Sequence, residues 1–193
     1  MDAFILKLTE NTRFNDDELF EFCSANKELR IERDDEGNLI IMSPSGSNTG
    51  RINLKILAQF SNWVYENETL GEGFDSSSGF LLPDGSMRAP DAAWVSKSKW
   101  GQLSQVEKDK FAPITPDFII ELKSPSDSFT TLKKKMEEWI ANGVQLGWLI
   151  DPELKKAFIY KPSQPVKEVD SFDFFLDGEN VLPGFQLDLS KLT

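Results

Sequence analysis

The mixed order of helical and extended segments constrains the fold of this chain more than any other feature of its sequence. Apolar residues recur at helical spacing from about Thr49 to Glu66, which predicts the longest helix. Extended segments flank it, and a further helix at Ser128–Asn142 precedes a strand at Leu146–Ile150. This order is typical of an α/β or α+β fold, in which a central mixed sheet is flanked by helices. We expect that fold class, although the order of the strands is not predicted.

The N-terminal part predicts a helix followed by a hairpin. Asn15 and Glu18 have the spacing of a capping box, so a helix should begin there and end near Asn26. The alternating segment Leu29–Arg33 and the apolar run Leu39–Met42 flank a turn, which indicates a β-hairpin.

The remaining elements follow from the same patterns. We expect strands at Phe74–Leu82 and Met87–Val95, a helix at Lys97–Lys108, and strands at Asp117–Lys123 and Ala157–Tyr160. The tail is rich in Phe, Pro and acidic residues and should pack irregular strands over the core.

Length and composition indicate one globular domain. The 193 residues suit a single domain, 1–193, and the hydrophobic share of 39% is high enough for a sizeable core. The sequence contains no apolar stretch of the ~18–20 residues that a membrane helix needs. Residues 1–10 also lack the layout of a signal peptide. We therefore expect a cytoplasmic protein without membrane contact.

The residue types exclude several kinds of chemistry. The chain has no histidine and one cysteine, Cys23, so it cannot build a Ser-His-Asp triad, an imidazole zinc site or a thiolate cluster. Any metal must therefore be a hard ion that prefers oxygen ligands. The net charge of −11 argues against a simple nucleic-acid-binding module, because affinity for phosphates depends on clustered Lys and Arg.

A carboxylate and an ammonium share one face of the predicted strand Asp117–Lys123. Side chains alternate along a strand, so Glu121 and Lys123 lie on the same face, with Cα atoms roughly 6.6 Å apart. Both can then reach one phosphate-sized ligand, with Glu121 binding Mg²⁺ and Lys123 neutralising charge on the phosphate.

A second carboxylate is needed because one is usually too little to hold Mg²⁺. Asp117 shares the face of Glu121 but lies roughly 13 Å along the strand, too far to share an ion. Asp91 is the better candidate, because it follows Pro90, which interrupts strand pairing and can redirect a side chain.

The helix after this strand supplies a further candidate, Lys135. It lies at the edge of the apolar stripe, close to Trp139, which indicates a buried acidic partner such as Glu121.

Each of these candidate site residues also has a purely structural explanation. Glu121 and Lys123 fit a solvated strand face, Lys135 can extend to water over Trp139, and Asp91 can be an ordinary turn residue.

At these positions the sequence resembles a known bacterial family. The Glu-Leu-Lys-Ser-Pro-Ser run at 121–126 and the Trp-Leu-Ile-Asp-Pro run at 148–152 are its most specific parts. The resemblance also includes the segments Leu29–Pro44, Phe74–Phe80 and Arg88–Val95, and it covers roughly residues 15–162. The family is the Uma2 type of restriction-endonuclease-like proteins.

The resemblance implies a PD-(D/E)XK fold, with a restriction-endonuclease-like core at about 29–162. It implies that Asp91 and Glu121 bind divalent metal, and that Lys123, Lys135 or both are catalytic. Glu32 resembles the glutamate that precedes the first hairpin turn of the family, which implies a supporting role. The chain departs from the pattern at Asn48, where an acid is expected.

Two functions from different classes follow. The first is a Mg²⁺-dependent endonuclease that hydrolyses DNA phosphodiester bonds, with Mn²⁺ as a substitute for Mg²⁺. A homodimer would let such an acidic chain assemble a basic groove for DNA. The second is a catalytically inactive module of the same fold that binds DNA or protein, which the net acidity and Asn48 favour.

Overall fold

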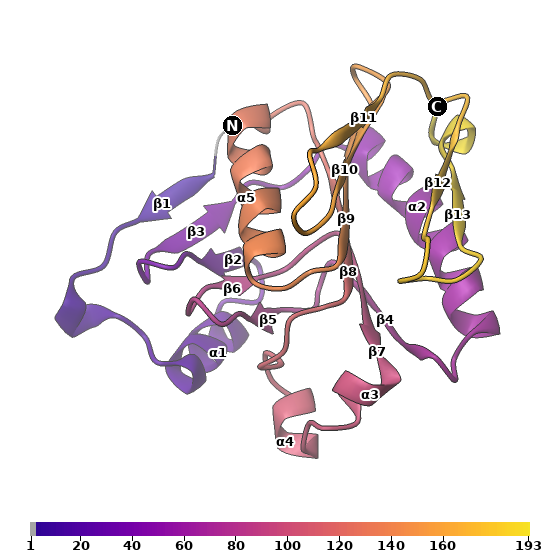
Figure 1. Ribbon diagram of the computed structural model, residues 1–193. Coiled ribbons are helices and arrows are strands. Elements are labelled where there is room, and N and C mark those ends of the chain that lie inside the picture. The colour runs from indigo at the N-terminus through magenta and orange to yellow at the C-terminus, as the bar shows by residue number, and fades with distance from the viewer. Residues whose placement is uncertain (1–2) are drawn as a thin grey trace.

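The computed structural model describes residues 3–193. Met1 and Asp2 lie outside the described residues, although the predicted domain 1–193 and the segment 1–10 both begin with them. Within the described part the strands form three sheets, of five, six and two strands (Figure 1). None of the helices in this part is long and apolar enough to cross a membrane.

The six-stranded sheet forms the centre of the fold. Its order is β11-β10-β9-β8-β7-β4, with β8 and β9 parallel and the other neighbours antiparallel. The strands are β4 (Gly71–Asp75), β7 (Ala92–Ser96), β8 (Phe118–Leu122), β9 (Leu146–Asp151), β10 (Lys156–Tyr160) and β11 (Lys167–Val169). The predicted mixed sheet is therefore confirmed.

Helices cover both faces of this sheet (Figure 1). On one face, α2 (Ser47–Glu66) buries Ile56 and Phe60 against strand β8 and its neighbours. On the other face, α5 (Phe129–Ala141) buries Met136 and Trp139. Because side chains alternate along β8, Phe118, Ile120 and Leu122 face α2, whereas Ile119 faces α5.

The five-stranded sheet lies beside the central one and has the order β1-β3-β2-β6-β5. Its strands are β1 (Phe4–Leu6), β2 (Arg30–Arg33), β3 (Leu39–Met42), β5 (Phe80–Leu81) and β6 (Met87–Arg88). Helix α1 (Asp16–Ala25) buries Leu19 against it. Asn15 and Glu18 form the predicted capping box, with N–H···O distances of 2.8 and 2.9 Å. The predicted helix and hairpin are confirmed.

Two strands that were predicted as continuous are each divided between the sheets. The segment 87–95 forms β6 in one sheet and β7 in the other, because Pro90 lies between them and has no N–H for a ladder. The segment 74–82 ends β4 at Asp75, whose side chain accepts the Ser77 N–H in a turn before β5. Both predictions were therefore wrong about continuity.

The predicted helix Lys97–Lys108 is also divided. It forms two short helices, α3 (Lys97–Trp100) and α4 (Gln105–Lys108). Ser104 begins the second of them with a capping box of its own, in which its backbone N–H and its hydroxyl both donate to Glu107.

The C-terminal tail packs over the core, as expected, and it lies on the face of the sheet that α2 covers. Its strands form a regular antiparallel pair, whereas irregular strands were predicted. It contains β12 (Phe175–Asp177), β13 (Gln186–Asp188) and a 3₁₀ helix, η2 (Leu189–Leu192), while a second such helix, η1 (Glu10–Thr12), lies near the N-terminus. The Phe185 ring stacks on Trp148, with ring centroids 5.7 Å apart. The tail therefore completes the core on this face.

Candidate active site

Strand β8 places Glu121 on the face of the sheet that α5 covers. The residue is 4% exposed, because α5 lies over it. Asp91 immediately precedes β7, the antiparallel neighbour of β8. The Asp91 N–H donates to the Ile120 carbonyl oxygen at 3.0 Å, and its Oδ2 accepts from the Leu122 N–H at 2.8 Å. The two carboxylates thus come from neighbouring strands at the same end of the pair.

Helix α5 supplies two side chains to Glu121. Lys135 Nζ lies 2.9 Å from Glu121 Oε1, and Trp139 Nε1 donates to the same oxygen at 2.9 Å. Lys135 and Trp139 are four residues apart and so lie on one face of the helix. The acidic partner predicted for Lys135 is therefore present.

Glu32 reaches the same place from the other sheet. Its Oε1 lies 2.8 Å from Lys135 Nζ and accepts from the Ala89 N–H at 3.1 Å. Lys135 therefore bridges two buried carboxylates, and through them it bridges the two sheets. The structure brings together four of the residues predicted for the site, Glu32, Asp91, Glu121 and Lys135.

Lys123 does not reach this cluster. Its Nζ lies 2.7 Å from Glu153 Oε2 and 3.9 Å from Asp151 Oδ2, and within residues 3–193 it makes no ion pair with Glu121. The strand alternation that placed Lys123 beside Glu121 ends with β8 at Leu122. Lys123 instead lines a separate cavity of about 200 Å³ together with Asn48.

Burial and charge shift the ionisation of the clustered groups. Burial, followed by the charges of Asp91 and Glu32, raises the pKa of Glu121 to about 7, although Lys135 opposes the rise. Burial also raises the pKa of Asp91. For Glu32, burial is outweighed by Lys135 and Arg88, which lower its pKa.

Lys135 remains an ammonium at neutral pH. Burial disfavours its charged form, but Glu121 and Glu32 outweigh this effect and raise its pKa above the ordinary value. The group can therefore act as a fixed positive charge, whereas a general base would need a lowered pKa.

The oxygen atoms at this site fit a hard cation. In the described chain, Glu121 Oε1 and Asp91 Oδ2 already accept hydrogen bonds, while the second oxygen of each carboxylate accepts none. No group of three or more His, Cys, Asp or Glu suited to a metal occurs among residues 3–193. Asp91 and Glu121 would therefore have to hold Mg²⁺ together with water, which is common for this ion.

Sequence reasoning missed two members of the cluster. Trp139 was placed in the apolar stripe without its hydrogen bond, although its position four residues after Lys135 was a usable signal. Arg88, whose Nη1 lies 3.1 Å from Glu32 Oε2, had no such signal, because the contact joins residues from different strands.

Asp117, which was set aside as too distant from Glu121, has partners of its own. Its Oδ2 accepts from the Ser96 N–H at 2.8 Å, and its Oδ1 lies 2.8 Å from Lys99 Nζ. These contacts fix the start of β8 against the end of β7.

The same fold occurs in a crystal structure described as a putative nuclease belonging to DUF820 from Anabaena variabilis. The two chains have a TM-score of 0.72 and 22% identity, and the match covers 86% of this chain and 90% of that one. A cryo-EM structure of a DrdV–DNA complex matches with a TM-score of 0.35 and 12% identity, over 64% of this chain and 12% of that chain. No curated protein matches the chain.

The fold thus places the chain among proteins of mixed α/β architecture similar to that structure. Residues 16–190 match the family model Uma2, described as "Putative restriction endonuclease". The chain belongs to the Uma2 family.

Proposed function

We propose that this protein is a metal-dependent endonuclease that hydrolyses DNA phosphodiester bonds. The observation that carries the proposal is the buried contact of Lys135 with Glu121 next to Asp91, at the end of two neighbouring strands. The description of the family supports the same class of reaction.

Each residue has a distinct role in this proposal. Asp91 and Glu121 hold Mg²⁺ or Mn²⁺, which supplies a Lewis acid and a water of lowered pKa when bound. Lys135 stabilises the negative charge that develops on the phosphate, because its raised pKa keeps it protonated. Glu32 orients Lys135 through the contact at 2.8 Å. Lys123 lies outside the cluster and has no role in the chemical step.

The test is cleavage of plasmid DNA with millimolar Mg²⁺ or Mn²⁺. Wild-type protein should cut the DNA, and chelation of the metal should stop it. Glu121→Ala should abolish cleavage, whereas Glu137→Ala, which removes an exposed carboxylate on the same helix, should leave it unchanged. Cleavage that survives Glu121→Ala would show that another site, or a contaminant, is responsible.

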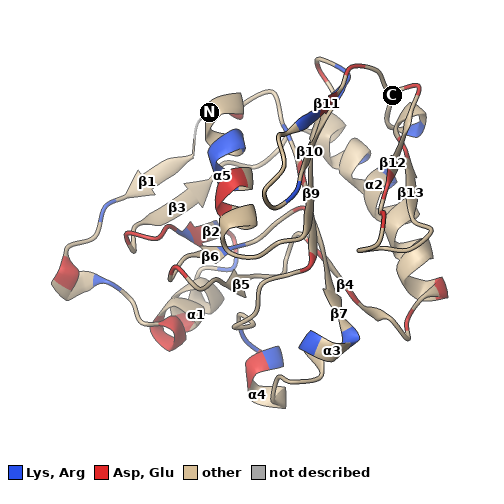
Figure 2. Cartoon of the chain, in the orientation of Figure 1, with Lys and Arg blue, Asp and Glu red and all other residues tan. Residues whose placement is uncertain are grey.

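One observation favours a second candidate, a catalytically inactive module that binds DNA or protein. Lys135 already neutralises charge at Glu121 and Glu32, so the cluster can persist as a structural ion pair without metal. The chain is also acidic, with a net charge of −11. Basic and acidic residues lie adjacent to one another on α5, so their charges offset each other there (Figure 2). This candidate predicts no rise in melting temperature with Mg²⁺ or Mn²⁺, whereas the endonuclease requires one.

A further inference from the structure

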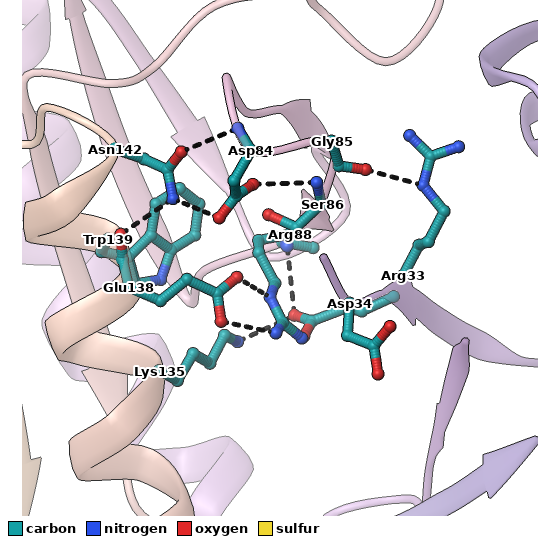
Figure 3. A network of polar contacts seen from close by, with 12 residues as sticks. Arg33, Asp34, Asp84, Gly85, Ser86, Arg88, Lys135, Glu138, Trp139 and Asn142 are labelled. Atoms are coloured by element: carbon teal, nitrogen blue, oxygen red, sulfur yellow. Dashed lines mark hydrogen bonds and ion pairs between the residues drawn. The ribbon is translucent and has the colours of Figure 1, made fainter. Parts of the chain in front are cut away.

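Arg88 joins three elements next to the proposed site. The residue is 7% exposed, and it lies in β6 between the hairpin strand β2 and helix α5. Its Nε lies 2.6 Å from Glu138 Oε1, and its Nη2 lies 2.7 Å from Glu138 Oε2 (Figure 3). Its Nη1 lies 3.1 Å from Glu32 Oε2. The guanidinium thus binds one carboxylate through two parallel bonds and a second carboxylate with the nitrogen that remains.

Both carboxylates control the position of Lys135. Glu138 follows Lys135 by three residues, so the two side chains lie on one side of α5, and the planar contact with Arg88 fixes the rotation of the helix there. Glu32 binds Arg88 through Oε2 and Lys135 through Oε1. Arg88 therefore restrains the helix that carries Lys135 and also the carboxylate that faces its ammonium.

The charges explain why this restraint matters. Glu32 is buried between two cations, Arg88 and Lys135. If Arg88 were removed, Lys135 would be the remaining cation in contact with Glu32, and the attraction would draw the ammonium away from Glu121. Glu138 would also lose its partner on β6.

We propose that Arg88 is a positioning residue that holds the Lys135 ammonium against Glu121. This inference rests on the proposed function, in which Lys135 acts at the phosphate. Among the described residues, Arg88 forms ion pairs with Glu32 and Glu138 and none with Asp91 or Glu121, so it acts through Lys135.

The chain offers a matched control for a merely structural role. Asn142 joins α5 to the turn before β6, since its Oδ1 accepts from the Asp84 N–H at 3.1 Å and its Nδ2 donates to Asp84 Oδ2 at 2.6 Å (Figure 3). This contact links nearly the same two elements as Arg88 and Glu138, but it does not include Glu32 or Lys135. Asn142→Ala therefore loosens this connection without the proposed effect.

The Trp139 indole reports the position of Lys135 without any need for activity. Trp139 Nε1 and Lys135 Nζ share Glu121 Oε1, so the indole N–H resonance depends on whether the ammonium is present. We would record it by NMR at one alkaline pH on the metal-free chain labelled with ¹⁵N-Trp, and assign it by its loss in Trp139→Phe. The Lys135→Met variant gives the reference position of the Trp139 resonance when the ammonium is absent.

Arg88→Met should move the Trp139 resonance towards its position in Lys135→Met, and Asn142→Ala should leave it at the wild-type position. In DNA cleavage, Arg88→Met should lower kcat on the order of 10-fold to 100-fold with little change in KM, because a misplaced group weakens the chemical step rather than binding. If Arg88→Met does not fold, Arg88→Lys serves instead. Lysine keeps the charge but lacks the planar guanidinium, so the Trp139 resonance should lie between its wild-type position and its position in Lys135→Met.

A resonance that stays at the wild-type position in Arg88→Met, or in Arg88→Lys where only that variant folds, would overturn the inference. An equal displacement by Asn142→Ala would overturn it as well. Because the NMR measurement requires no cleavage, either result leaves the proposed function standing. Wild-type protein that cuts no DNA would contradict the function alone.

Discussion

The ammonium of Lys135 lies 2.9 Å from Oε1 of Glu121, although the two residues come from helix α5 and strand β8. The lysine closest to the candidate metal ligands is therefore supplied by a helix that packs on the sheet. Lys123, two residues after Glu121 in the sequence, instead pairs with Glu153 at 2.7 Å. This arrangement makes the two lysines separable by experiment.

Lys135→Met should lower the rate of DNA cleavage far more than Lys123→Met. Removing one preorganised charge at a developing anion costs on the order of 100-fold to 1,000-fold in kcat, and we expect a loss of that size for Lys135→Met. Lys123→Met should stay within about 10-fold of wild type. Single-turnover cleavage rates with saturating metal measure both, and the reverse order of the two losses would contradict the assignment.

Glu121→Gln should make the metal-free protein more stable at pH 8. The pKa of Glu121 is raised from 4.5 to about 7, so between these values the folded protein holds a proton that the unfolded chain has released. The stability that protonated Glu121 contributes is present below pH 4.5 and is lost as the pH rises towards 7. Glutamine cannot ionise and so avoids this loss. The free energy of unfolding at pH 8 should therefore rise on the order of 1–3 kcal/mol.

Urea denaturation at pH 4.5 and pH 8 measures this difference, which should nearly vanish at the lower pH. Glu137→Gln is the control, because this side chain is exposed on the same helix and its replacement should change the free energy of unfolding little. A Glu121→Gln protein that is less stable than wild type at pH 8 would show that the ionised carboxylate stabilises the fold.

Gly71→Ala should destabilise the edge of the central sheet. A Cβ at Gly71 would lie 2.3 Å from the backbone oxygen of Val95, so β4 and β7 would have to separate. Overpacking of this kind costs about 1–3 kcal/mol in the free energy of unfolding. Gly50→Ala is the matched control, because nothing lies within 4 Å of its Cβ in α2, and it should raise stability by about 0.5–1 kcal/mol. Thermal unfolding of both variants tests whether Gly71→Ala lowers the stability of the protein and Gly50→Ala raises it.

Local sequence signals predicted the elements well where the cause of the structure is local. The Asn15 and Glu18 pair specified the start of α1, and the apolar spacing specified α2. Lys135 was predicted to meet an acidic partner because a charge at the edge of an apolar stripe needs one, and Glu121 is that partner.

Contacts between distant segments were less accessible. Strand alternation predicted Lys123 beside Glu121, but it cannot show that the extended chain ends at Leu122. The contact of Arg88 with Glu32 depends on which sheet receives each half of the segment around Pro90, and strand order is a property of the whole fold. Glu32 was therefore indicated only by the family resemblance.

Calorimetric titration of the protein with Mn²⁺ or Mg²⁺ tests the central claim most directly. Wild-type protein should bind the ion more tightly at pH 8 than at pH 6, because metal and protons compete for Glu121. Asp91→Asn, which retains an oxygen for the Leu122 N–H, should lose this binding, and Glu137→Gln should retain it. Binding that is absent in the wild type, or unchanged in Asp91→Asn, would contradict a metal site at Asp91 and Glu121.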